Sequence, residues 1–134
     1  MSLFVTIYIP IYGRMVLISL GQTDEELLDC FKGCEVKNPK KEVKSIQLSA
    51  TCDGRGGIMK GTDGIIRLSE YDDTDPYLRG VLAHEIHHCV FRMLDALGFT
   101  HHEDSDEAYA YLTGFIHQEF LEAIQSNKEE SDGR

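Results

Sequence analysis

Short runs of β-branched and aromatic residues dominate the beginning of the chain. Two of them, residues 3–9 (LFVTIYI) and 14–20 (RMVLISL), are separated by Pro10 and by the turn-forming pair Tyr12-Gly13. Such runs on either side of a turn signal predict two neighbouring strands or a hairpin.

The middle of the chain predicts two further strands, at residues 45–52 and 65–69, joined by the Gly-rich segment 53–57. That segment is not followed by the Gly-Lys-Ser/Thr of a phosphate-binding loop, so it is expected to be a connecting loop. The polar and basic segment 35–44, which contains Asn38-Pro39, also predicts a loop.

Helical signals begin at Thr23, which has Glu26 at the spacing of a capping box. A short helix should run from there to about Phe31, with Gly33 ending it. The longest predicted helix starts after Asp75, with a proline in its first position, and continues to residue 97 before a glycine stops it.

A last helix should start within residues 104–106 and continue to about Gln125, with acidic residues in its first turn that suit the helix macrodipole. Its apolar residues recur at helical spacing: Ala108, Leu112, Phe115, Ile116, Phe120 and Ile124. Residues 126–134 are polar and predict a flexible tail. Together these elements predict a single α+β domain over residues 1–125, with a small mixed sheet packed on the helices.

Composition and charge argue against nucleic acid and anionic membranes as binding partners. Hydrophobic residues make up 42% of the 134 residues and charged residues 27%, as in a soluble globular protein. The excess of 23 acidic over 13 basic residues gives a net charge of −10, the wrong sign for binding nucleic acid or an anionic membrane. No apolar run reaches the length of a membrane-spanning helix, and no export signal is recognisable, so we expect a cytoplasmic protein.

Four cysteines, Cys30, Cys34, Cys52 and Cys89, are expected to be reduced thiols in that compartment. The first three are a weaker candidate for a zinc site, because structural zinc ligands are usually paired on a turn and not on a continuous helix. The simpler interpretation is that the thiols are small buried side chains.

The long helix carries the sequence His84-Glu85-Ile86-His87-His88, which matches HExxH. Residues four apart lie on one side of a helix, so His84 and His88 can direct both imidazoles at one metal ion. Glu85 lies beside them and is a candidate general base for a metal-activated water. His87 is about 100° from His88 around the helix and should face solvent.

A catalytic zinc takes three protein ligands and one open position, so a third ligand is needed. The metzincin pattern would require Gly and His where this chain has Phe91 and Leu94. In the gluzincin pattern the third ligand is a Glu about twenty residues downstream, and Glu107 follows His88 by 19 positions. Glu103 and His101 compete with Glu107 for that role.

Two segments, VLAHEIHH and SDEAYAYL, resemble the gluzincin-type zincins, in particular small metallopeptidase-like proteins of phages and prophages. The resemblance covers residues 74–125. It implies a zinc ion on His84, His88 and Glu107, with Glu85 as base and proton shuttle. It also implies a mixed sheet whose edge strand, 65–69, borders the cleft and can pair with an extended peptide.

One position departs from the larger gluzincins, which place an Asp four residues after the ligand Glu, where this chain has Tyr111. Orientation of the ligands must then come from a backbone carbonyl, Asp95 or Asp106. Candidates for stabilising the transition state are several aromatic and imidazole side chains: Tyr109, Tyr111, His101, Tyr71 and His102.

The function predicted from the sequence is therefore a zinc-dependent metallopeptidase acting on a peptide or protein. The alternative is a weakly active or inactive zincin-fold protein that serves in binding or assembly in a phage or prophage. The intact Glu85 favours the enzyme, because a purely structural zinc has no use for a base beside it.

Overall fold

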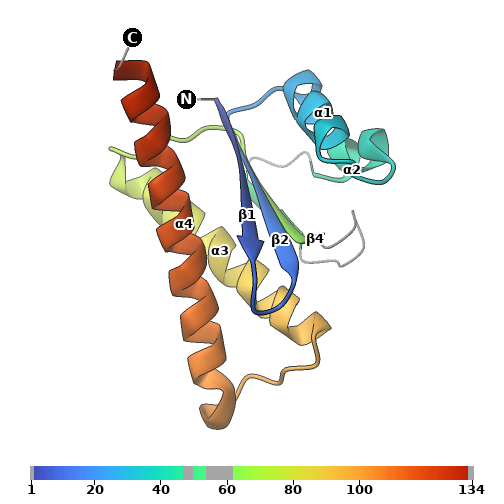
Figure 1. Cartoon of the computed structure of the whole chain (residues 1–134), viewed down its shortest axis with the longest axis vertical. Coiled ribbons are helices and arrows are strands. Elements are labelled where there is room, and N and C mark those ends of the chain that lie inside the picture. The colour runs from blue at the N-terminus through green and yellow to red at the C-terminus, as the bar shows by residue number, and fades with distance from the viewer. Residues whose placement is uncertain (1, 47–49, 54–61, 133–134) are drawn as a thin grey trace.

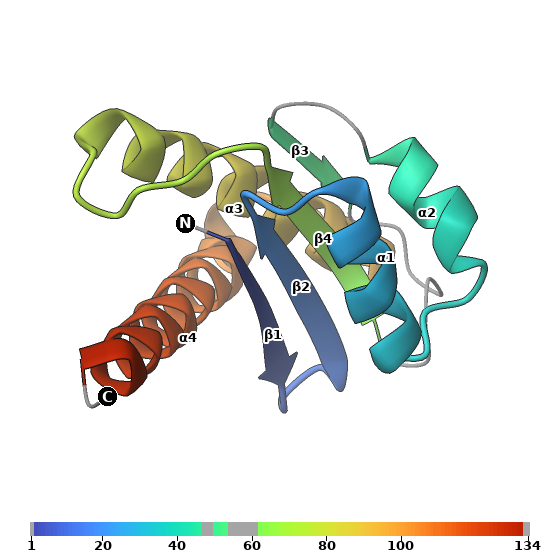
Figure 2. The ribbon, with the colours of Figure 1, turned by 90° about the horizontal axis from the view of Figure 1, so that it is seen from above.

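The computed structural model describes residues 2–46, 50–53 and 62–132, and it has three layers. A four-stranded sheet lies between two helices on one face and two on the other (Figures 1 and 2). The strands are β1 (Leu3–Ile9), β2 (Arg14–Leu20), β3 (Ala50–Asp53) and β4 (Thr62–Leu68). The helices are α1 (Asp24–Gly33), α2 (Pro39–Ser45), α3 (Pro76–Ala96) and α4 (Asp106–Asp132), with a short 3₁₀ helix at Glu103–Ser105. The predicted α+β class is confirmed.

The predicted hairpin is confirmed. Strands β1 and β2 pair antiparallel from Leu3 opposite Leu20 to Ile9 opposite Arg14. Gly13 closes the turn with φ of 63°, a conformation that glycine adopts without strain, and its N–H donates to the Ile9 carbonyl at 2.9 Å.

The order of the strands corrects one prediction. Strand β4 pairs parallel with β2 and antiparallel with β3, so the sheet is mixed and its order is β1-β2-β4-β3. The segment 65–69 was expected at the sheet edge, but β4 lies inside the sheet, because β3 covers its outer side with Cys52 opposite Ile66. The edges are β1 and β3.

Alternation along the strands separates two cores. The larger core lies under α3 and α4 and takes Val5, Ile7 and Ile9 from β1, with neighbouring residues of β2 and β4. The smaller core lies on the other face, where Leu17 and Ile65 pack against α1 and α2. Burial of both sheet faces fixes the position of each helix on the sheet.

Helix α1 begins as predicted. The Glu26 N–H donates to Thr23 Oγ1 at 3.1 Å, and the Thr23 N–H donates to Glu26 Oε1 at 3.0 Å, which completes the capping box. The hydrogen bond from the Thr23 N–H, and after it the one from the Ser2 hydroxyl, lower the pKa of Glu26, since they favour its charged form. The helix ends at Gly33, as expected.

Helix α2 was not predicted, because a loop was expected over residues 35–44. Pro39 occupies its first turn, where a missing N–H costs nothing, and Lys and Glu are good helix formers. Val43 is its one buried residue and docks it onto the smaller core. Ser45 belongs to this helix, so the strand predicted from residue 45 begins only at Ala50; residues 47–49 and the Gly-rich segment 54–57 lie outside the described residues.

Helices α3 and α4 fill the other face. The cap of α3 is as predicted, with the Tyr77 N–H donating to Asp75 Oδ1 at 2.9 Å. Helix α4 continues to Asp132, beyond the predicted end at Gln125, and Lys128 in this extension forms an ion pair with Asp73. Among the helices in the described ranges, none is long and apolar enough to cross a membrane.

Arg67 of β4 forms hydrogen bonds to α1, to the segment before α1 and to the residue after α2. Its loss should therefore destabilise the fold. It is 7% exposed, and it donates to the Ile46 carbonyl at 2.8 Å, the Gln22 carbonyl at 3.1 Å and Asp24 Oδ1 at 2.8 Å. Arg67→Met keeps the volume but leaves these acceptors without their donor, so we expect the free energy of unfolding to fall by about 2–4 kcal/mol. Urea denaturation measures the effect.

The matched control is Arg79→Met, because Arg79 is exposed on α3. We expect that variant to unfold within about 0.5 kcal/mol of the parent protein. An Arg67→Met variant as stable as Arg79→Met would show that the three hydrogen bonds of Arg67 contribute nothing to stability.

Candidate metal centre

Helix α3 directs its two predicted metal ligands away from the core. Its buried side carries Leu82, Ile86 and Met93, which pack against the sheet and α4. His84 is exposed and His88 is half-buried on the other side of the helix. Their Nε2 atoms are 3.1 Å apart, and their rings meet edge to face with centroids at 4.7 Å.

The geometry of this pair fits one shared metal ion. Zinc binds imidazole nitrogen at about 2.0–2.1 Å with tetrahedral angles, which places two nitrogen ligands about 3.3 Å apart. The observed 3.1 Å between the Nε2 atoms is close to that value. The same separation also suits a hydrogen bond between the two imidazoles.

Glu85 lies next to the pair and is 8% exposed, although carboxylates are seldom buried. Together with His84 it lines a groove of about 510 Å³ along the first half of α3, here called the α3 groove. The other lining residues are Pro76, Tyr77, Gly80 and Val81. A buried carboxylate, one imidazole ligand and space for a small molecule therefore meet in one place.

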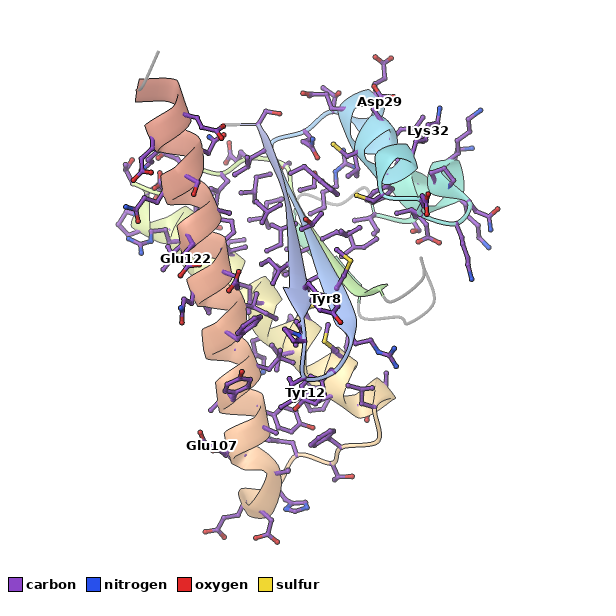
Figure 3. The ribbon with its side chains drawn as sticks, in the orientation of Figure 1. Tyr8, Tyr12, Asp29, Lys32, Glu107 and Glu122 are labelled. Carbon is purple, nitrogen blue, oxygen red and sulfur yellow. The ribbon has the colours of Figure 1, made fainter. Side chains whose placement is uncertain are left out.

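The structure does not bring Glu107 to the histidine pair. The buried side of α4 carries Tyr109, Leu112 and Ile116, and Glu107 lies on the opposite side of the helix, exposed. Figure 3 shows Glu107 on the side of α4 away from α3. Its role as a ligand stays a prediction of the resemblance, without support from this geometry.

The alternatives for the third ligand are not brought together either. Glu103 is exposed in the 3₁₀ helix, and His101 pairs with Asp106 at 2.9 Å. Among the residues that the structure describes, no three His, Cys, Asp or Glu side chains are close enough to hold a metal ion. Of the predicted ligands, His84 and His88 are the two whose ring nitrogens lie close together.

None of the candidates for transition-state stabilisation is among the described residues that line the α3 groove with Glu85. Tyr109 is buried, with its ring 4.4 Å from that of His101. Tyr111 is exposed and stacks on Phe115 at 6.2 Å. Burial, and after it the neighbouring Tyr111, raise the pKa of Tyr12.

A second and larger groove, of about 720 Å³, runs between α3 and α4 and is here called the α3–α4 groove. His87, predicted to face solvent, is exposed and lies at the border of this groove, with its ring 5.9 Å from that of His88. The full lining is His87, Val90, Phe91, His101, Asp106, Tyr109, Ala110, Thr113 and Gly114. The histidine pair therefore lies between two grooves.

Tyr77 is a residue that the sequence did not single out. It is 75% exposed and lines the α3 groove with His84 and Glu85. The available signal was its spacing, because a residue seven positions before His84 lies two turns earlier on the same side of a helix.

The second zinc site considered from the sequence gains no support. Cys30 and Cys34 form no disulfide with each other, and the side chain of Cys52 lies outside the described ones. Burial, and then the neighbouring Cys30, raise the pKa of Cys34, which opposes the thiolate that zinc requires. Cys89 is buried in the larger core, as the simpler interpretation predicted.

Comparison with known proteins adds no relative: no family model, curated protein or solved structure matches the chain.

Proposed function

We propose that this protein is a zinc-dependent hydrolase that cleaves peptide bonds. The observation that carries the proposal is the 3.1 Å separation of the His84 and His88 Nε2 atoms, with the buried Glu85 beside them. Two imidazoles and an adjacent carboxylate are the part of a zinc hydrolase that one helix can supply.

His84 and His88 would hold the metal, and a bound zinc would supply an acidified water and a Lewis acid for the scissile carbonyl. Glu85 accepts the proton of the attacking water and returns it to the departing amine. We further propose that the protein acts in the cytoplasm, where Cys30 and Cys34 would stay reduced.

A second candidate function is a binding or assembly protein of phage or prophage origin that kept the helix without the catalysis. The position of Glu107 favours this candidate, because two histidines alone leave a metal with few protein ligands. The buried Glu85 favours the hydrolase, since an unused carboxylate would be more stable in water.

Elemental analysis of the purified protein, combined with cleavage of a peptide library, separates the two functions. A hydrolase should contain about one zinc per chain and cleave peptides, and a chelator should stop cleavage reversibly. Zinc without cleavage would support the binding protein. A protein that neither binds zinc nor cleaves peptides after incubation with zinc would contradict the proposed metal site.

A further inference from the structure

The α3–α4 groove has no part in the proposed hydrolysis, yet it is the larger of the two grooves beside the histidine pair. Its walls come from both helices. Phe91 of α3 is 46% exposed, and the buried Tyr109 of α4 lies opposite, with ring centroids 6.2 Å apart and planes tilted by 40°. The faces of such rings attract cations, and more strongly where water is partly excluded.

The mouth of this groove is acidic. Asp106 lies there, with one carboxylate oxygen held by His101 Nε2 at 2.9 Å. The His101 ring is itself held against Tyr109, with centroids 4.4 Å apart. Because the imidazole fixes one end of the contact, the carboxylate of Asp106 is oriented before any ligand arrives.

Among the described residues that line the groove, none is Lys or Arg, and the basic side chains there are the imidazoles of His87 and His101. Further carboxylates precede Asp106 in the chain, at Glu103 and Asp104. The whole chain adds a net charge of −10. The potential in the groove is therefore expected to attract a positive charge.

We propose that the α3–α4 groove binds the side chain of Arg or Lys in a peptide. The alkyl part of such a side chain would lie against the exposed ring of Phe91, and its charged end would reach Asp106. The floor at Gly114 is open, since a Cβ there would meet nothing within 4 Å beyond the local helix backbone. Binding requires neither metal nor turnover; if the proposed function holds as well, a basic residue would mark the preferred peptide substrates.

A direct test uses N-acetyl-arginine amide and its uncharged analogue, N-acetyl-citrulline amide, as probes in an NMR titration of the metal-free full chain. We expect arginine to shift the amide signals of Phe91, Tyr109 and Ala110 saturably. Citrulline has the same shape without the charge, and it should bind at least about fivefold more weakly. Equal binding of the two probes, or shifts located elsewhere, would overturn the proposal.

Two variants and one matched control sharpen the test. Asp106→Asn removes the charge at the mouth and should weaken arginine binding at least about fivefold. Gly114→Leu fills the groove, and Gly80→Leu makes the same change at a second open helical glycine, in the α3 groove. Both leucines favour the helix, so both variants should fold. Arginine binding should be lost only in Gly114→Leu; its retention there, or equal loss in both, would overturn the proposal.

The arginine-binding test can be decided separately from the proposed hydrolase activity. Arginine binding without peptide cleavage would support the groove and contradict the proposed enzyme, whereas cleavage without selective arginine binding would do the reverse.

Discussion

Glu85→Gln should lower peptide hydrolysis by about 10²–10⁴-fold and leave zinc binding unchanged. This range is what a positioned general acid–base contributes to catalysis. Gln has the same shape as Glu and still fits the buried position beside His84, but it cannot accept the proton of the attacking water. Initial rates on a peptide identified from the library, measured with zinc content by elemental analysis, give both quantities on one sample.

The control for that variant is Glu122→Gln, on the exposed side of α4, where Glu122 only accepts a hydrogen bond from Gln118 at 3.3 Å. Its hydrolysis should stay within about twofold of the parent rate, as expected for a surface change away from the site. Parent-like hydrolysis by Glu85→Gln would eliminate Glu85 as the base. If Glu85→Gln loses both activity and zinc, Glu85 contributes to metal binding and not to proton transfer.

His84→Ala and His88→Ala should each lower zinc affinity by at least about 100-fold. Losing a residue that only supports a ligand costs 10–100-fold in metal affinity, and losing the ligand itself should cost no less. The natural control is His87→Ala, since His87 is adjacent in sequence but borders the α3–α4 groove. Competition against a zinc-binding dye measures the three affinities, and similar affinities in all three variants would contradict a site on His84 and His88.

The same assay decides the role of Glu107. On the geometry described above, Glu107→Gln should leave zinc affinity within about twofold of the parent, because this side chain lies on the exposed side of α4. A loss of tenfold or more would support the ligand role that the gluzincin resemblance implies. The first turn of α4 would then have to face α3 when metal is bound.

Local signals in the sequence were sufficient for several elements. Thr23 and Glu26 predicted their capping box because the hydrogen bonds join residues three apart. Asp75 and the proline after it predicted the start of α3, because this cap too depends only on adjacent residues. The hairpin followed from two apolar runs around one turn, so its pairing also depended on neighbouring residues.

Features set by distant contacts were predicted less well. The polar segment that forms α2 has a single buried side chain, Val43, and its helix depends on docking to a core that the local pattern does not show. The interior position of β4 requires pairing on both sides, with β3 and with β2, and β2 lies more than 40 residues earlier in the chain. The spacing of Glu107 from His88 gives its place along α4 but not the rotation of that helix, which Tyr109 and Leu112 fix through the core.

Helix α3 serves the core and the candidate metal centre with the same turns. Leu82 and Met93 pack inward on either side of His84 and His88 in the sequence, and each residue added to a helix rotates everything after it by about 100°. Insertions or deletions of a single residue between Leu82 and Met93 would turn either the imidazoles or the apolar side chains out of place. In relatives of this chain, length variation is therefore expected in the connecting segments, while this helix changes only by substitution.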